Sequence, residues 1–502
     1  MQKFDHLKRR LLTGAVFFLW STAGFAQTED LAEQSQHAKE LMTEGRFSEA
    51  IPIYQKLVAA VPGNPGLVLN LGLAEQMAGQ PQKAVPHFET VLKAQPDNVP
   101  ALTSLAMAEL QMNQPHAAVP PLEKLLRVQP QDVNARGMLA GAYMALNRTS
   151  EAAAQYRKLT AADASDAKAW YGLGKAYETL AAETFTRLSK NAPQSPYVAA
   201  LLADSRLQRK QYRSAFFFYH QAQKGLPDLP GLHSGLARVY QDTNHPDWAV
   251  AERKLERPAG NCHSQTAECR FLTGDFLGAA KLGVASAPPA TLFWATRAYN
   301  QLAINAFDHL GQMPDSVEIH ALKAEILHGH GQDAQAADEW RTALKLSPDD
   351  PRLETELATS LFLAHKYDGV MPMLRKLLAH QTDVPGLNFM MGESLWRTQQ
   401  PEKAVPYLTA ALKEEPQFLP AHAALGMVYA LLNRNAEAIP HLEKAISLDD
   451  DGSIHYSLAR ACQAAGQTEQ AKKAMQGYQQ IKQKNQQIND QLAQEAEIVA
   501  PK

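Results

Sequence analysis

Apolar residues recur along this chain at the three- and four-residue spacings that place them on one face of a helix. The clearest stretch is residues 419–452, LPAHAALGMVYALLNRNAEAIPHLEKAISLDDDG. Leu425 and Tyr429 lie four apart in its first half, and a similar spacing starts at Ala438 in its second half. Asn433 separates the halves, and asparagine tolerates the left-handed conformation that ends many helices. The stretch therefore predicts a helix, a tight turn and a second helix.

Two features of this stretch predict how its helices pack. Ala424 and Gly426 are small residues in the first helix, so another helix can cross there closely. Pro440 is expected in the first turn of the second helix, where a missing N–H costs little. One such helix pair cannot bury its apolar face alone, so the face must be covered by neighbouring copies.

The chain repeats this pair with a period of 34 residues. An alanine early in the second helix marks the repeat in phase. It stands at Ala50, Ala84, Ala118 and Ala152, at Ala215 and Ala249, and at Ala336, Ala404 and Ala438, with Val370 between Ala336 and Ala404. The period predicts an array of stacked helix pairs, which can grow to 502 residues without a single large core.

The residues at these positions resemble the tetratricopeptide repeat family, in which each repeat has a helix A and a helix B. The helix A signature is matched by Trp170, Leu173, Gly174 and Tyr177, and the helix B signature by Ala84, Phe88 and Pro96 and by Ala215, Tyr219, Ala222 and Pro227. About ten repeats run in phase. The resemblance implies an all-α, right-handed α-solenoid of stacked antiparallel helix pairs.

The N-terminus has the three parts of an export signal. Basic residues up to Arg10 precede the short apolar run Leu11–Trp20, and Gly24 and Ala26 are small residues where a signal peptidase cuts. We expect residues 1–26 to be removed, which predicts a periplasmic or extracellular protein. The alternative is an uncleaved amphipathic start. No later segment is expected to cross a membrane as a helix.

The charge of the mature chain argues against nucleic acid. The whole chain has 49 Lys and Arg against 52 Asp and Glu, and residues 1–26 carry four of the basic and one of the acidic residues. The remainder therefore has 45 against 51, a net charge of −6. Nucleic-acid binding favours a concentrated basic face, and these charges are interspersed.

Two places lack the turn between helix A and helix B. No Gly, Asn or Pro interrupts ETLAAETFTRLSK after Tyr177, so one longer helix is predicted there. The same departure recurs at residues 298–314, AYNQLAINAFDHLGQMP, offset by 122 residues. The predicted divisions are 1–26 signal peptide, 27–166 N-terminal array, 167–290 middle array with a fused-helix repeat, 291–475 C-terminal array and 476–502 polar capping helix and tail.

The chain has three cysteines, Cys262, Cys269 and Cys462. In an exported protein the first two are candidates for a disulfide. Residues seven apart on a continuous helix lie about 10 Å apart, too far for a disulfide, so pairing requires a non-helical segment. The stretch RPAGNCHSQT suits that requirement, although whether the two are bonded stays open. Cys462 replaces a helix A tyrosine and is expected to be a buried free thiol.

Known catalytic and metal-binding signatures are missing from the sequence. The pair His328 and His330 lies at a predicted turn and is interpreted as solvated, so no metal or cofactor is expected. By the family resemblance, helix A residues line a concave groove that holds peptides or partner helices. Its expected members here are Tyr171, Lys175, Asp204, Arg238, Phe362, Phe389, Trp396, Met427 and Tyr456. Trp396 and Phe389 could equally pack against the next repeat.

The array itself is therefore the expected functional element. We predict a non-catalytic scaffold or adaptor that binds protein or peptide partners. Envelope assembly or secretion is suggested only by analogy with exported relatives. Two alternatives remain, a regulatory subunit that positions a partner enzyme and a carbohydrate-binding solenoid that uses groove aromatics such as Trp396.

Overall fold

The computed structural model of the protein describes residues 30–256, 265–380, 384–495 and 498–501. Within these ranges every regular element is a helix, which confirms the predicted all-α fold. None of the helices in the described ranges combines the length and apolar character needed to cross a bilayer. The predicted signal peptide, residues 1–26, lies outside the described residues and stays a prediction.

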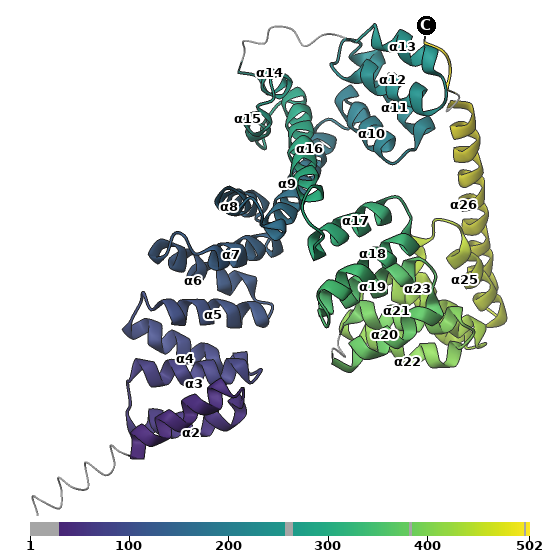
Figure 1. Ribbon diagram of the computed structural model, residues 1–502. Helices are drawn as coiled ribbons and strands as arrows, with labels where there is room; N and C mark the ends of the chain where they lie inside the picture. Colours follow the sequence, from purple (N-terminus) through teal and green to yellow (C-terminus); the bar gives the residue numbers. More distant parts are fainter. Residues whose placement is uncertain (1–29, 257–264, 381–383, 496–497, 502) are drawn as a thin grey trace, which may run out of the picture. The chain divides into compact units, whose positions relative to one another are not determined.

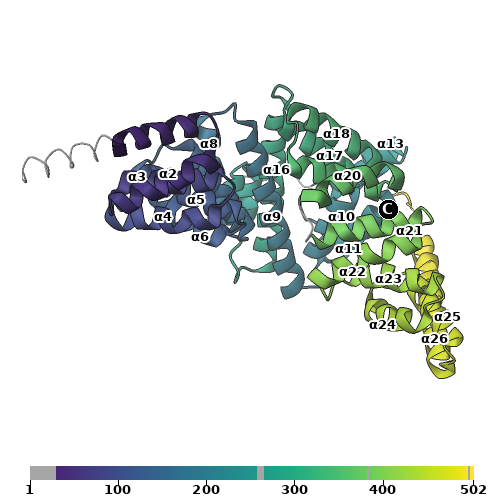
Figure 2. The same cartoon turned by 90° about the horizontal axis from the view of Figure 1, so that it is seen from below.

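The described chain divides into two compact units, and the first ends at Thr179. Its helices stack in sequence order, and from α2 to α8 each packs against the next (Figures 1 and 2). They are a helix over residues 30–43, α2 (Phe47–Ala60), α3 (Pro65–Met77), α4 (Pro81–Ala94), α5 (Val99–Gln111), α6 (Pro115–Val128), α7 (Val133–Ala145), α8 (Thr149–Ala162) and the first part of α9 (Ala167–Asn191).

The second unit begins at Leu180, inside α9. Its regular helix pairs are α10 (Pro196–Gln208), α11 (Tyr212–Gly225), α12 (Leu232–Asp242), α13 (Pro246–Arg253), α17 (Val317–Gly329), α18 (Asp333–Leu346), α19 (Pro351–Leu363), α20 (Tyr367–His380), α21 (Pro385–Arg397), α22 (Pro401–Glu414), α23 (Leu419–Leu431) and α24 (Asn435–Ala445). The remaining helices are α14 (Ala267–Leu272), α15 (Phe276–Lys281), α16 (Pro289–Gly311), α25 (Ser453–Ala464), α26 (Thr468–Glu495) and the 3₁₀ turn η1 (Ile446–Leu448).

Helix A begins at a side-chain cap that recurs with the period of the sequence. Asn64, Asn98, Asp132 and Asp166 lie 34 residues apart. The side-chain oxygen of each accepts a hydrogen bond from a backbone N–H in the first turn of the helix that follows. These bonds satisfy donors that the helix cannot pair internally, so the cap fixes where helix A starts.

The turns between helix A and helix B have the left-handed residues that the sequence predicts. Gly45 and Gly79 have φ angles of 76° and 74°, and Asn113 and Asn147 both have 55°. Asn433 has 60° in the C-terminal array. Glycine and asparagine adopt this conformation at low cost, which makes the turn short enough for the two helices to pack side by side.

The recurring alanine of helix B lies in the core in every repeat that the period predicts. Its exposed fraction is 0% at Ala50, Ala84, Ala118, Ala152, Ala215, Ala249, Ala336, Ala404 and Ala438, and also at Val370. Gly426 marks the same close approach on helix A, because a Cβ there would lie 2.7 Å from Cγ of Leu442. Small residues therefore set the distance between the paired helices.

The expected position of Pro440 in a first turn is wrong. Pro440 is the sixth residue of α24, inside the helix, where its missing N–H removes one i to i−4 hydrogen bond. Proline occupies the sixth residue of several other B helices, namely Pro52 of α2, Pro86 of α4, Pro120 of α6, Pro372 of α20 and Pro406 of α22. All six rings are exposed, so water can hydrate the carbonyl that each one leaves unpaired.

Both predicted fused helices are present. α9 has 25 residues and α16 has 23, without the turn that divides the other pairs. The repeat between α13 and α16 is shortened to two helices, α14 and α15, of six residues each. They are joined at Gly274, which has a φ angle of 84°. α26 runs for 28 residues and overlaps the predicted capping segment, residues 476–502, although it begins earlier, at Thr468.

Candidate functional site

Aromatic rings of the C-terminal repeats form a continuous row across successive helices. Phe362 of α19 lies 6.0 Å from Phe389 of α21, and Phe389 lies 5.4 Å from Phe418, the N-cap residue of α23, between ring centroids. Tyr367 of α20 extends the row, 5.9 Å from Phe362. All three contacts are edge-to-face, the arrangement that aromatic quadrupoles favour. We call these four residues the aromatic row.

The aromatic row packs on the core and also meets solvent. Each of its members is half-buried, and Phe362 and Phe389 rest on the hydrophobic cluster of α19–α26. Phe389 therefore contacts a neighbouring repeat, as one interpretation expected, and keeps an accessible edge, while its role in a binding groove stays a prediction. Rigid rings that are already ordered lose little entropy when a partner covers them.

Trp396 lies on the same helix as Phe389 but has a polar neighbour. It is half-buried, and the Arg397 guanidinium lies 4.2 Å from the centroid of its ring. Glu393 accepts a hydrogen bond from Arg397 Nη2 at 3.0 Å and so holds the guanidinium in place. Trp396 is thus an aromatic surface with one face covered by a cation.

The two remaining C-terminal candidates differ in exposure. Met427 of α23 is half-buried against the same cluster as Phe389. Tyr456 of α25 is 44% exposed, and its ring centroid lies 5.5 Å from that of Tyr478 in α26.

The middle candidates divide between the two compact units. Tyr171 and Lys175 belong to the first unit, and Arg238 belongs to the second. Tyr171 is half-buried. Lys175 Nζ pairs with Glu178 at 2.9 Å, and Arg238 Nε pairs with Asp242 at 3.0 Å. Both cations therefore already have a carboxylate partner on their own helix, and an acidic ligand would have to compete with it.

Asp204 is the centre of a hydrogen-bond network between helices. Its carboxylate accepts a hydrogen bond from Tyr219 Oη at 2.8 Å and from Arg297 Nε at 3.0 Å. Arg297 also donates from Nη1 to the Pro230 carbonyl at 2.9 Å. Burial and the Asp204 charge raise the pKa of Tyr219, so its phenol stays protonated and donates. The network joins α10, α11 and the fused helix α16.

Three repeats link helix A to helix B through a histidine at one shared position. The Nδ1 atoms of His233, His320 and His422 lie 2.6, 2.7 and 2.7 Å from Glu252, Glu339 and His441, in each case 19 residues later. In the α23–α24 repeat, the carboxylate is thus replaced by the imidazole of His441. His422 Nε2 donates to the Pro416 carbonyl at 3.1 Å. In neutral His422, Nδ1 is therefore the acceptor, and Nδ1–H of His441 donates.

This replacement predicts that the C-terminal repeats lose stability in acid. The pKa of His441 lies below the usual 6.5 because burial disfavours the charged ring, with His422 and Lys444 adding positive charge. Below pH 6.5 the unfolded chain takes up a proton that the folded chain resists, so stability is complete above that pH and falls below it. The loss is at most about 1.4 kcal/mol per pH unit until the folded pKa is reached. Urea unfolding between pH 4.5 and 8 measures it.

The control comes from the other two repeats. His441→Glu recreates the His–Glu pair seen at His233 and His320, and it should flatten the acid branch of the curve relative to the natural chain. If the natural chain and the variant have parallel pH profiles, the histidine pair is not the cause.

In the described part of the chain, no three His, Cys, Asp or Glu residues gather closely enough to hold a metal ion. Cys462 is buried and free, as expected, and burial raises the pKa of its thiol. Cys269 is buried at the start of α14, and Cys262 lies outside the described residues, so their pairing stays a prediction.

Sequence reasoning missed Tyr367, Phe418 and Arg397. Tyr367 and Phe418 lie at the ends of helices, outside the helix A positions that the family resemblance assigns to the groove. The spacing of 29 residues between Phe389 and Phe418 could have signalled a contact between neighbouring repeats.

Sequence profiles of the tetratricopeptide repeat match residues 35–100, 109–176, 389–453 and 452–473. None of the curated proteins matches the sequence. A tetratricopeptide repeat protein from Parabacteroides merdae ATCC 43184 is 13% identical over 66% of this chain and 98% of its own, with a TM-score of 0.31. MamA from Desulfovibrio magneticus RS-1 is 17% identical over 34% of this chain and 98% of its own, with a TM-score of 0.31. A thermophilic repeat protein from Thermus thermophilus is 22% identical over 36% of this chain and 98% of its own, with a TM-score of 0.29.

Proposed function

We propose that this chain is a tetratricopeptide repeat protein that serves as an exported, non-catalytic scaffold and binds protein partners through the aromatic row of its C-terminal repeats. Proteins of this family typically act by binding other proteins, and the family positions of Phe362 and Phe389 are those that line its concave groove. Export rests on the predicted signal in residues 1–26, and a role in envelope assembly or secretion is a proposal by analogy.

The observation that supports this proposal most strongly is the continuity of the aromatic row. Its rings contact one another across α19, α21 and α23 and stay half-exposed. Clustered aromatic side chains that are ordered before binding are the usual centres of protein interfaces. Trp396, 4.2 Å from the Arg397 guanidinium, extends the surface with a polar margin. A sugar would need an open ring face to stack on, and Arg397 already covers one face of Trp396, which favours a protein partner over a carbohydrate.

A pull-down from the native envelope tests the proposal. Bait beginning at Gln27 should retain specific partners, and Phe389→Ala combined with Trp396→Ala should weaken their capture by at least about tenfold, as expected for interface centres. The half-buried Tyr407 of α22 provides the control, because Tyr407→Ala removes a similar ring from helix B. Undiminished capture by the double variant, or equal loss with Tyr407→Ala, would contradict the assignment of the surface.

Mass spectrometry of the chain recovered from the envelope tests the predicted cleavage of the signal peptide. The chain recovered from the envelope should have the mass of residues 27–502, because cleavage is expected after Ala26. A mass that includes residues 1–26 would contradict a cleaved signal without affecting the binding proposal.

A further inference from the structure

The chain ends in a short apolar segment that returns to the middle of the sequence. α26 is rich in Gln and Lys, whereas the described residues after it, Ile498–Pro501, carry no charge and are not helical. Val499 is bound by Tyr240 of α12, and Figure 1 shows the C-terminus beside α13. About 250 residues separate the segments that meet here, so the contact closes a very long loop.

The segment is held by one side chain and one backbone group. Ile498 is half-buried in the hydrophobic cluster that contains Phe216 and Tyr240. Tyr240 Oη donates a hydrogen bond to the Val499 carbonyl at 2.9 Å, while the Val499 side chain is 50% exposed. The Ile498 side chain thus points toward the cluster, the Val499 side chain points toward solvent, and the Val499 carbonyl is bound by Tyr240. Proteins commonly recognise extended peptides in this way.

Tyr240 needs this acceptor. Its exposed fraction is 0%, and burial raises its pKa to about 12, so the phenol keeps its proton. A buried hydroxyl without a partner is costly. Tyr143 occupies the corresponding position of an N-terminal repeat and donates to Glu123 within its own array. The described acceptor of Tyr240, by contrast, lies 259 residues away in the C-terminal segment.

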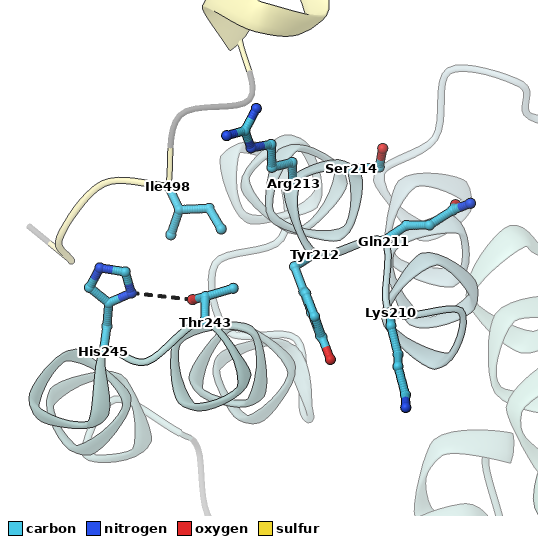
Figure 3. Close-up of a pocket in the computed structure, with 8 residues that line it drawn as sticks. All are labelled: Lys210, Gln211, Tyr212, Arg213, Ser214, Thr243, His245 and Ile498. Carbon is cyan, nitrogen blue, oxygen red and sulfur yellow. Dashed lines mark hydrogen bonds between the residues drawn. The ribbon is translucent and has the colours of Figure 1, made fainter.

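A pocket of about 630 Å³ adjoins Ile498 at this contact. It is formed by the turns of two neighbouring helix pairs, residues 210–214 and 243–245, which we call the turn-edge site. Figure 3 shows Ile498 between His245 on one side and Arg213 on the other. Lys210 and Arg213 give the site two basic side chains.

We propose that the turn-edge site is a peptide-binding surface for a short extended segment with a β-branched aliphatic residue, and that its occupant is the chain's own C-terminus. The side chain of Ile498 packs on the apolar cluster and forms one wall of the pocket, and Tyr240 binds the following carbonyl. The site is separate from the aromatic row and does not depend on the function proposed for it. A free peptide of the same chemistry competes with the segment for the site.

Hydrogen exchange of the intact protein tests occupancy. Truncation after Glu495 should raise amide exchange in α12 and α13 severalfold and leave α2–α8 unchanged. Ile498→Ser in the full chain should have a similar effect. Val499→Ser is the matched control, because it keeps the bound carbonyl and changes an exposed side chain. Unchanged exchange after truncation, or equal effects of the two serine variants, overturns the proposal.

Binding of a labelled peptide covering residues 490–502 tests the ligand class. By fluorescence anisotropy it should bind the truncated chain at least about tenfold more tightly than the full chain, in which Val499 already accepts the Tyr240 hydrogen bond. Tyr240→Phe in the truncated chain should weaken it about fivefold, the equivalent of one hydrogen bond. If truncation raises amide exchange but the peptide does not bind the truncated chain, the proposed peptide-binding surface is wrong. A full chain that is dimeric by light scattering, and monomeric when truncated, assigns the segment to a second copy and overturns its intramolecular placement.

Discussion

Replacing Ala182 with proline is expected to destabilise the protein by at least about 3 kcal/mol. Ala182 is the sixteenth residue of α9, and its side chain is exposed, so the effect comes from the backbone. Proline removes one helix hydrogen bond there, and its ring clashes with the carbonyl of Glu178. Because the boundary between the two compact units lies within α9, the break should also separate one calorimetric transition into two.

Ala154 provides the matched control for this prediction. It is the sixth residue of α8, the position that proline already occupies in six other B helices. Ala154→Pro should therefore cost much less than Ala182→Pro, and Ala182→Gly should cost only about 1 kcal/mol. Equal losses for the two proline variants would mean that the position within the helix does not decide the effect.

Gly235→Ala is expected to cost about 3 kcal/mol, because it forces a buried ring to move. A Cβ on Gly235 would lie 2.3 Å from Cζ and 2.4 Å from Oη of Tyr219. Tyr219 is only 1% exposed, and its hydroxyl donates to Asp204, which also binds Arg297. The variant therefore combines overpacking with a broken hydrogen-bond network. Hydrogen exchange in α10–α12 and thermal unfolding by circular dichroism measure the loss.

Replacing glycine with alanine at Gly137 should have the opposite effect on stability. Gly137 lies within α7, and a Cβ there would meet nothing within 4 Å. Gly137→Ala should stabilise the protein by about 0.5–1 kcal/mol through better helix propensity. If Gly235→Ala proves as harmless as Gly137→Ala, Tyr219 is not fixed in the way that its contacts indicate.

Local chemistry explains why most of the fold could be predicted. The alanine of helix B, the Gly or Asn of the turn and the Asn or Asp cap each act within one repeat, so a 34-residue period reveals all three. The missing turn after Tyr177 likewise predicts the 25-residue helix α9. Pro440 was misplaced because the first residue of α24, Asn435, lies further from it than the sequence pattern suggests.

The candidate site could be predicted only where it follows the repeat. Phe362, Phe389 and Trp396 occupy helix A positions that the family resemblance identifies, and the structure finds them half-buried there. Asp204 occupies such a position too, yet Arg297 binds it from 93 residues away. Contacts at this separation have no local signature, and the partner of Tyr240 was missed for the same reason.

The distance along the chain between Tyr240 and Val499 also has a consequence for biosynthesis. Helix pairs can stack in chain order as the polypeptide emerges, because each one packs mainly on its predecessor. The carbonyl that accepts the Tyr240 hydrogen bond is made 259 residues later, which at about 5–20 residues per second is a delay of roughly 13–50 seconds. During that interval the nascent middle repeats lack this acceptor, so chaperones that guard emerging chains have a defined window in which to act.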